Sequence, residues 1–280
     1  MKSEECLKQF CFEYQFQLDK ESVKHYLCAI KQLIEYTGRN FDVITKRDIR
    51  QWLGYLAEIG YKPWTIHSKL TGLKTFYRYC MEEGFVSTNP AAKIPFPAQE
   101  DKLPYYLNLK QLSQLRELVN GRLPEERVII EVLYATGIRI SELSAMKKED
   151  IYWTGRMIKI PKGKRKKGRI VPFTRKCEIH LKAYLETRPN GTPYVFIGPR
   201  NKDRPIHPDT VGQWFRAYAR ELGFRVTPHA LHHTFAANLA KRGMPIHCIQ
   251  TLLGHEEPKQ TRLYARLYSD ARKEMYDEYM

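Results

Sequence analysis

The sequence predicts a mainly helical protein with one small β-hairpin, an α+β architecture divided into two domains. Three observations predict it. Apolar residues recur at helical spacing through most of the first ninety residues. A proline-rich stretch then interrupts this pattern. Beyond it, further helical segments surround two short β-branched segments separated by a basic run. A chain of 280 residues is long enough to build a separate core in each domain.

The first domain, residues 1–90, is expected to be a helical bundle. Its second helix is predicted to begin after Ser22 as N-cap and to stop at Gly38. Thr45 followed by Asp48 resembles a capping box at the start of the third helix. A proline suits the first turn of the fourth. The four helices are predicted over about 4–18, 23–38, 46–60 and 63–84.

A linker is placed at residues 91–106, because the stretch 90–104 contains four prolines and excludes a regular helix. The second domain, residues 107–280, resumes the helical pattern. The dipeptide Thr136-Gly137 is predicted to end one helix, and the next is predicted to begin near 139–141. Helices are predicted over about 108–119, 125–136, 175–187, 208–222, 229–242 and 245–253, with a short one at the end of the chain.

A two-stranded hairpin with a cationic tip is predicted over residues 156–173. The segments R-M-I-K-I-P and G-R-I-V-P-F flank the run K-G-K-R-K-K-G-R. Between Asp150 and Glu178 there are ten basic residues and no acidic one. The whole chain has 47 Lys plus Arg against 31 Asp plus Glu, a net charge of +16. Such an excess favours a polyanionic partner, nucleic acid before an anionic membrane.

Composition excludes several classes of protein. No run reaches the eighteen or so apolar residues that a membrane span needs. The N-terminal M-K-S-E-E-C lacks the apolar region of a secretory signal. The six cysteines are scattered without a C-x-x-C pair, so neither a disulfide framework nor a cysteine zinc site is indicated. We therefore expect a cytoplasmic protein with reduced thiols and no membrane association.

Three of the nine histidines lie in the stretch T-P-H-A-L-H-H-T-F, which begins at Thr227. His229 and His233 are four residues apart and can face one side of a helix, as in zinc metalloproteases. That motif needs a glutamate directly after its first histidine, where this chain has Ala230. No neighbouring carboxylate supplies a clear third ligand. We expect no metal site and no cofactor.

The same residues fit a different pattern, which resembles the tyrosine recombinases of the lambda-integrase superfamily. T-G-I-R-I-S-E-L (136–143) is similar to the first box of that family. P-H-A-L-H-H-T-F (228–235) is similar to the second, usually written H-x-L-R-H-T-F, and L-L-G-H (252–255) resembles its continuation. Tyr264 lies nine residues past that last histidine, where the family has its nucleophile. K-G-K (162–164) lies where the family carries its hairpin lysine. The resemblance covers nearly the whole chain and is nearest to the Xer-type and simple integrase branch.

The resemblance implies both a fold and an activity. The first domain would be a SAM-like core-binding bundle, and the two domains would form a C-clamp around duplex DNA. The enzyme would cut and rejoin paired DNA sites through a 3′-phosphotyrosine intermediate and a Holliday junction, without a cofactor. It would be a homotetramer on DNA, a monomer or weak oligomer when free, and nucleoid-associated. The segment after Tyr264 would dock on a neighbouring subunit or fold back in cis.

The resemblance also assigns roles to individual residues. Tyr264 would attack the phosphodiester, Arg139 would bind its phosphate, and Lys162 would protonate the leaving 5′-oxygen, with Lys164 as the nearest rival. Glu142 would orient Arg139. The remaining catalytic candidates are His229, as proton acceptor or phosphate ligand, His232, and His255, with His233 supporting them. Predicted contacts with the DNA backbone are Lys69, Lys74, Arg78, Lys164, Arg165, Lys166, Lys167 and Arg169.

One position departs from the family pattern, because His232 stands where the family has its second arginine. Arginine has a permanent charge and a two-pronged donor, whereas a histidine with a pKa of about 6.5 is mostly neutral at pH 7. Losing one donor to the transition state costs on the order of 10²–10³ in rate. The substitution is natural and tolerated, or was made to trap a DNA complex, or marks a protein that binds DNA without efficient cleavage. The sequence leaves all three open.

The alternatives to recombination are a DNA-binding relative with impaired or no cleavage, and an enzyme of the same chemistry that relaxes or resolves DNA. A generic basic RNA-binding module leaves the five ordered motifs unexplained.

Overall fold

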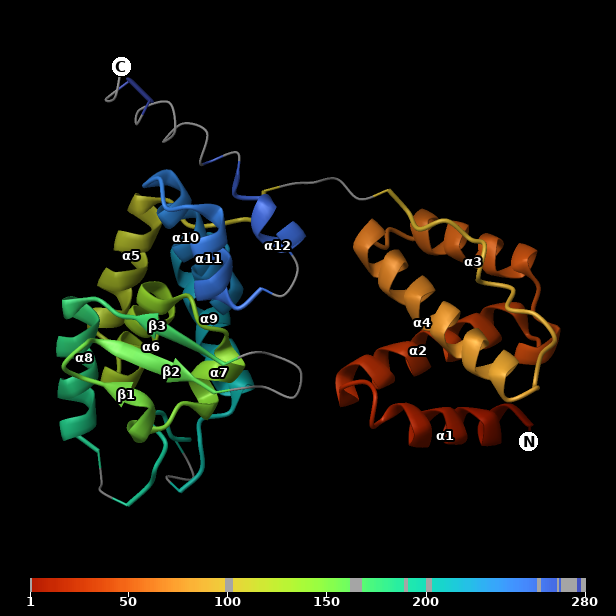
Figure 1. Cartoon of the computed structure of the whole chain (residues 1–280), viewed down its shortest axis with the longest axis horizontal. Coiled ribbons are helices and arrows are strands. Elements are labelled where there is room, and N and C mark those ends of the chain that lie inside the picture. The colour runs from red at the N-terminus through yellow and green to blue at the C-terminus, as the bar shows by residue number, and fades with distance from the viewer. Residues whose placement is uncertain are drawn as a thin grey trace. The chain divides into compact units, whose positions relative to one another are not determined.

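The computed structural model describes residues 2–98, 103–161, 168–188, 191–199, 203–255, 258–265, 267 and 276–277. It divides into two compact units, Met1–Glu100 and Asp101–Met280 (Figure 1). The division falls inside the stretch that the sequence predicts as a linker. Ala91 and Ile94 are nevertheless buried in the core of the first unit, and Leu107 is buried in the core of the second.

The first unit is helical throughout its regular structure. Its core is rich in aromatic rings, with Phe10 of the first helix within 5.5 Å of Phe76 and 5.4 Å of Tyr79, between ring centroids. Such edge-to-face and tilted contacts add to the apolar area buried. The hydroxyl of Tyr77 donates to the carbonyl of Phe41 at 3.0 Å. The elements are α1 (Lys2–Tyr14), α2 (Lys20–Thr37), η1 (Phe41–Val43), α3 (Lys46–Glu58) and α4 (Pro63–Glu82).

The helix ends of this unit confirm most of the predicted signals. Gly38 ends α2 in the left-handed region with φ 63°, and its N–H donates to the carbonyl of Ile34. Thr45 and Asp48 form the predicted capping box of α3. The prediction of Ser22 as N-cap of α2 is wrong. Asp19 is the cap, and its carboxylate accepts from both the N–H and the hydroxyl of Ser22, so the helix begins earlier.

The second unit packs helices around a small sheet. The predicted hairpin is present as β2 and β3, antiparallel, with Ile158 opposite Val171. A short strand that the sequence did not predict, β1, extends it to the order β1-β2-β3. The elements are α5 (Leu109–Asn120), α6 (Pro124–Thr136), α7 (Ile140–Ala145), η2 (Lys148–Asp150), β1 (Ile151–Tyr152), β2 (Met157–Ile160), β3 (Arg169–Pro172), α8 (Arg175–Glu186), α9 (Pro208–Leu222), α10 (Pro228–Lys241), α11 (Ile246–Leu253) and α12 (Pro258–Arg262). The helix predicted at the end of the chain lies mostly outside the described residues.

Helix α6 is the centre of the second unit. It contacts α5, α8, α10 and β3 (Figure 1). A run of its residues from Val128 to Leu133 is buried on every side, glutamate included. An apolar helix of this kind has no solvent face and is expected only in a core. It ends at Gly137, whose left-handed φ of 64° turns the chain into α7.

Among the described residues, no helix has the length and apolar character that a bilayer span requires.

Gly137 provides a stability test. A methyl group there would lie 2.3 Å from Cδ1 of Phe235, whereas Gly223, with a similar φ of 71°, has open space around it. We expect Gly223→Ala to cost about 1 kcal/mol for the left-handed backbone, and Gly137→Ala to cost a further 1–3 kcal/mol, roughly, for overpacking against Phe235. Urea unfolding of both variants measures the difference. Equal losses would show that Phe235 moves aside freely.

Candidate functional site

Arg139 joins two distant segments. It is the N-cap of α7, and its backbone N–H donates to Oε2 of Glu142 at 2.8 Å. Its guanidinium donates to the carbonyls of Leu253 at 3.0 Å and Gly254 at 3.3 Å, at the end of α11. The last carbonyls of a helix have no partner within the helix, so they suit a cation. The side chain stays 20% exposed, so part of its charge faces solvent.

Glu142 lies between two arginines. Arg169, the first residue of β3, donates from both terminal nitrogens to the two Glu142 oxygens at 2.8 Å, in a bidentate pair. Arg139 adds a longer contact of 3.4 Å from its guanidinium. Burial alone would raise the pKa of the Glu142 carboxyl, but the hydrogen bonds from Arg169 and from the Arg139 backbone lower it below its ordinary value. Glu142 is therefore ionised at neutral pH.

His232 is buried in the second turn of α10. Its Nδ1 lies 2.5 Å from the carbonyl of Gly137, and its Nε2 lies 3.3 Å from Nε2 of His255. A carbonyl only accepts, so Nδ1 of His232 carries the proton and its Nε2 is an acceptor in the neutral ring. His255 must then donate from Nε2. The neutral ring thus directs a lone pair, and no N–H, toward His255.

The two imidazoles face each other nearly head on. Their ring centroids are 5.5 Å apart, which exceeds the 3.3 Å between the nitrogens by about the two ring radii. A metal ion held by both rings would require their lone pairs to converge on a third point. Within the described ranges, no group of three metal-ligating side chains is found. The geometry is that of a hydrogen bond.

Both neighbouring histidines of α10 are held neutral. Burial lowers the pKa of His232 to about 3, with the charges of His233, His255 and Arg139 opposing protonation further, although the Gly137 carbonyl favours it. Burial likewise lowers the pKa of His233 to about 4, and the charges of His229 and Arg225 lower it as well.

Tyr264 is fully covered, with no exposed surface. Its hydroxyl lies 2.5 Å from Nδ1 of His233, and burial raises the pKa of the phenol, so the hydroxyl donates to a neutral ring. One turn earlier, Thr261 lies 2.9 Å from Nδ1 of His255 through its hydroxyl. Thr261 and Tyr264 therefore bind two histidines, His255 after α11 and His233 in α10.

The structure brings together most of the predicted catalytic residues. Arg139 bonds to Glu142 and to the end of α11, directly before His255. His232 bonds to His255, and Tyr264 bonds to His233, the residue next to His232. His229 lies one turn before His233, in the first turn of α10, and is exposed. Lys162 lies outside the described residues, as do Lys164, Arg165, Lys166 and Lys167.

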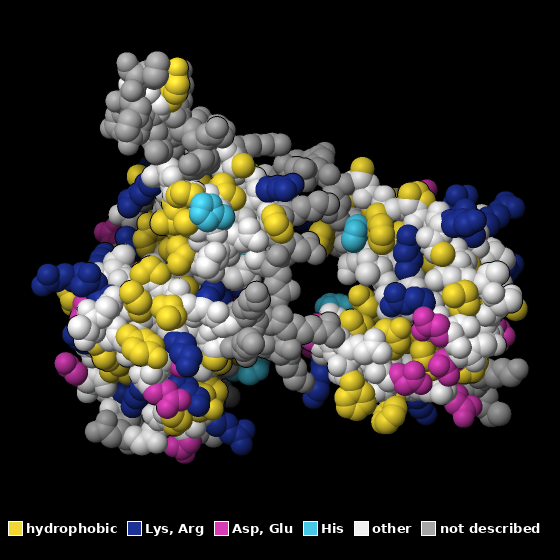
Figure 2. Space-filling view, viewed as in Figure 1, with side chains coloured by type: hydrophobic (Ala, Val, Ile, Leu, Met, Phe, Trp, Pro, Cys, Tyr) yellow, Lys and Arg dark blue, Asp and Glu magenta, His cyan; other side chains and the backbone are white. Residues whose placement is uncertain are grey.

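The predicted DNA-binding residues of the first unit lie on α4. Lys69 bonds Gln32 and lies 5.3 Å from the ring centroid of Tyr61. Lys74 donates to the carbonyl of Ala92 at 3.2 Å, and Arg78 is exposed. On the face shown in Figure 2, lysine and arginine side chains are spread over both units with acidic ones among them. Backbone binding by these residues stays a prediction.

The sequence predicts Arg169 as a DNA-binding charge, and this also stays a prediction. The structure gives it protein partners instead. Its side chain is 7% exposed, it pairs with Glu142, and its Nε donates to the carbonyl of Leu252 at 2.7 Å.

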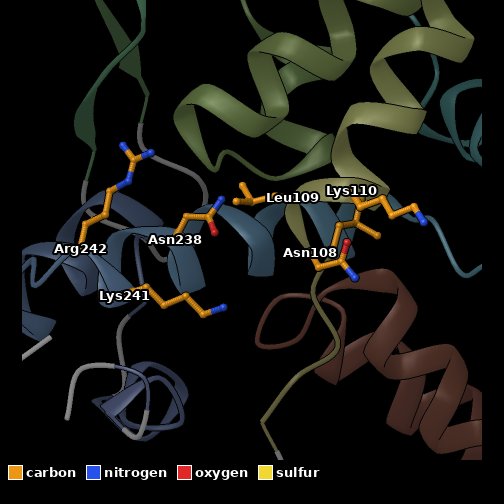
Figure 3. Close-up of a pocket in the computed structure, with 7 residues that line it drawn as sticks. Asn108, Leu109, Lys110, Asn238, Lys241 and Arg242 are labelled. Atoms are coloured by element: carbon orange, nitrogen blue, oxygen red, sulfur yellow. The ribbon is translucent and has the colours of Figure 1, made fainter. Parts of the chain in front are cut away.

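A separate hollow lies on the second unit, between the start of α5 and the end of α10. Figure 3 shows side chains of the two helices facing each other across it. Its volume is about 530 Å³, and it contains no member of the histidine cluster. It is lined by Leu107, Asn108, Leu109, Lys110, Asn238, Lys241 and Arg242.

Two partners in the site were missed from the sequence. Thr261 supports His255, and the carbonyl of Gly137 fixes the His232 tautomer. No sequence pattern signals a bond between residues 95 positions apart, as the Gly137 carbonyl and His232 are. The sequence shows a threonine three residues before Tyr264, but its hydrogen-bond partner, His255, is determined only by the folded conformation of the chain.

Comparison with protein families identifies two matching models. The model described as phage integrase family matches residues 106–270, and that described as phage integrase, N-terminal SAM-like domain, matches 13–84. The chain is 32% identical to the tyrosine recombinase XerA of Pyrococcus furiosus over 231 residues, which cover 82% of this chain and 79% of that protein.

Solved structures show the same fold. The Tn1549 transposon integrase in complex with circular intermediate DNA matches with a TM-score of 0.80 at 18% identity, covering 99% of each chain. A lambda integrase tetramer bound to a Holliday junction matches with a TM-score of 0.73 at 18% identity, covering 91% of this chain and 77% of that one.

The lowered pKa values predict how stability depends on pH. An unfolded histidine has a pKa of about 6.5, whereas the folded pKa is about 3 for His232 and about 4 for His233. At pH values between the folded and the unfolded pKa, the unfolded chain therefore binds more protons than the folded chain. The free energy of unfolding should therefore fall as pH is lowered from about 6.5 toward 4, by up to about 1.4 kcal/mol per pH unit and histidine.

Urea unfolding at several pH values tests this. His232→Gln keeps an amide donor for the Gly137 carbonyl but cannot titrate, so its stability should fall less steeply with acidification. The same slope in both proteins would contradict a neutral, buried His232.

Proposed function

We infer that this chain, which belongs to the phage integrase family, is a site-specific tyrosine recombinase. Its substrate is double-stranded DNA, and it assembles into oligomers on that DNA. Homologues named as tyrosine recombinases favour this enzyme class over a relative that only binds DNA. The finer proposals are a homotetramer on two paired sites, as expected for a reaction that joins four DNA ends, and association with the nucleoid, as expected for an enzyme whose substrate is DNA.

The reaction is transfer of a DNA phosphoryl group to tyrosine. The Tyr264 hydroxyl gives its proton to a histidine, for which His229 is the candidate, and its oxygen attacks the phosphorus. The bond to the 5′-oxygen breaks, and a 3′-phosphotyrosine forms. The departing 5′-oxygen takes a proton from Lys162. Religation by the 5′-hydroxyl of a partner strand reverses these steps and returns the proton, so strands exchange without an external energy source. Two such exchanges create and then resolve a Holliday junction.

The observation that carries this proposal is the convergence of Arg139, His232, His255 and Tyr264 from four separate segments of the chain. The partly exposed guanidinium of Arg139 would bind the non-bridging oxygens, and His255 would donate to them from Nε2, the atom that now meets His232. His229, exposed in the first turn of α10, would reach the same phosphate or accept a proton.

Tyr264 cannot reach a phosphodiester while it is fully covered. We propose that DNA binding moves the segment around 258–265 and breaks the hydrogen bond to His233. The loss of burial would also lower the pKa of the phenol, whose rise is due to burial. The nucleophile would then become reactive only when the substrate is present.

The proposed mechanism predicts that Tyr264→Phe abolishes the covalent adduct. The substrate is a nicked duplex whose sequence is selected from a random pool by binding to the protein. After cleavage, the short fragment that carries the 5′-hydroxyl diffuses away, so the 3′-phosphotyrosine cannot be religated and is trapped. The native chain should form a protein–DNA adduct on a denaturing gel, whereas Tyr264→Phe should bind the duplex and form none. Tyr276→Phe, at an exposed tyrosine, is the matched control and should form the adduct normally. An adduct that persists in Tyr264→Phe would reassign the nucleophile.

Another prediction concerns the histidine in place of the family's arginine. Nε2 of neutral His232 carries a lone pair directed at His255, so this nitrogen could donate to a phosphate only after protonation. His232→Arg should therefore raise the cleavage rate on the order of 10²-fold, and because burial lowers the pKa of His232 to about 3, this advantage should persist from pH 8.5 down to pH 5.5. Single-turnover adduct formation from pH 5.5 to 8.5 measures it. Equal or slower cleavage by the arginine variant at pH 8 would show that His232 needs no second donor.

A further inference from the structure

Arg169 is built into the site more deeply than a DNA-binding charge needs to be. It is the first residue of β3, yet its guanidinium turns inward and is nearly covered. Phosphate contacts in DNA come from cations that reach the surface. The position of this arginine calls for a different role.

Two arginines bind three consecutive carbonyls at the end of α11. Arg169 donates from Nε to Leu252 at 2.7 Å, and Arg139 donates to Leu253 and Gly254 at 3.0 and 3.3 Å. Together they satisfy carbonyls that the end of a helix leaves without partners. The next residue is His255, so this turn sets where its imidazole lies.

Gly254 shows how closely the guanidinium fits this turn. Its φ is +62°, and a methyl group there would lie 2.7 Å from a terminal nitrogen of Arg169. The left-handed backbone and the approach of the arginine each favour glycine at this position. Arg169 therefore packs against the turn as well as bonding to it.

The charges explain why the second arginine matters. Glu142 carries one negative charge and touches both guanidiniums, but Arg169 holds both of its oxygens at 2.8 Å while Arg139 approaches only to 3.4 Å. Without Arg169, the buried carboxylate would be left to Arg139 alone. An unpaired buried carboxylate is costly, so it would draw the Arg139 guanidinium away from the phosphate.

We propose that Arg169 is a positioning residue for strand cleavage: it neutralises Glu142 and holds the 252–255 turn, so that Arg139 and His255 reach the phosphate. The proposal rests on the proposed recombinase function. It assigns Arg169 no contact with DNA.

The test measures cleavage and binding separately in Arg169→Met. Single-turnover adduct formation on the nicked duplex at saturating protein should fall roughly 10- to 100-fold, as expected for displaced catalytic groups. The Kd for the same duplex and its dependence on salt should stay unchanged. Arg169→Lys keeps a charge beside Glu142 but loses the bidentate pair, and should fall between Arg169→Met and the native chain. Arg175→Met, at an exposed arginine of the same unit, is the control and should cleave normally.

The decisive variant is Arg169→Met combined with Glu142→Gln. If Arg169 acts by neutralising Glu142, removing the carboxylate should restore part of the cleavage lost in Arg169→Met. A double variant that is no faster would overturn the proposal. So would a weaker Kd with a shallower salt slope and an unchanged rate at saturation, because that result defines a phosphate contact.

A readout without catalysis separates this proposal from the proposed function. The ring-nitrogen NMR signals of His232 and His255 should shift in Arg169→Met, and in the double variant they should move back toward their native positions. Unchanged signals would overturn the positioning role whether or not the chain cleaves DNA. If the native chain forms no Tyr264-dependent adduct while these signals shift as expected, the proposed function fails and the arrangement around Arg169 stands.

Discussion

The arrangement of the site depends on one buried carboxylate. Glu142 accepts hydrogen bonds from Arg139, at the start of α7, and from Arg169, at the start of β3. The same two arginines also donate to carbonyls at the end of α11. Three segments that are distant in the sequence thus meet at one charge. A buried ion pair gains little net stability, but breaking it is costly, so it fixes a geometry more than it strengthens the fold.

Much of this fold could be predicted, because local chemistry decides where helices end. The capping box at Thr45 and Asp48 and the left-handed Gly38 and Gly137 were visible as residue types at fixed spacings. The mistaken cap at Ser22 has a physical reason. Serine and aspartate are both good caps, and here Asp19 caps the helix by accepting hydrogen bonds from the N–H and the hydroxyl of Ser22, three residues later.

The site was predicted less completely, because its members are joined by contacts between distant residues. The sequence motifs identified Arg139, His232, His255 and Tyr264, which the structure brings together. The motifs carried no signal that the guanidinium of Arg169 turns inward. A basic run shows only that many side chains carry a positive charge. The side chain of Arg169 is buried because it pairs with the Glu142 carboxylate in the folded chain.

Histidine at position 232 makes this arrangement of charges more important. Of the described groups around Glu142, two arginines face one carboxylate, which leaves one net positive charge beside the proposed phosphate position. With an arginine at 232 there would be a second permanent charge. With a neutral, buried histidine there is no such second charge, and the lone pair of its Nε2 faces His255. In the proposed mechanism, charge stabilisation by the described residues would then rest on Arg139, and its freedom to face the phosphate would depend on Arg169 holding the carboxylate away from it.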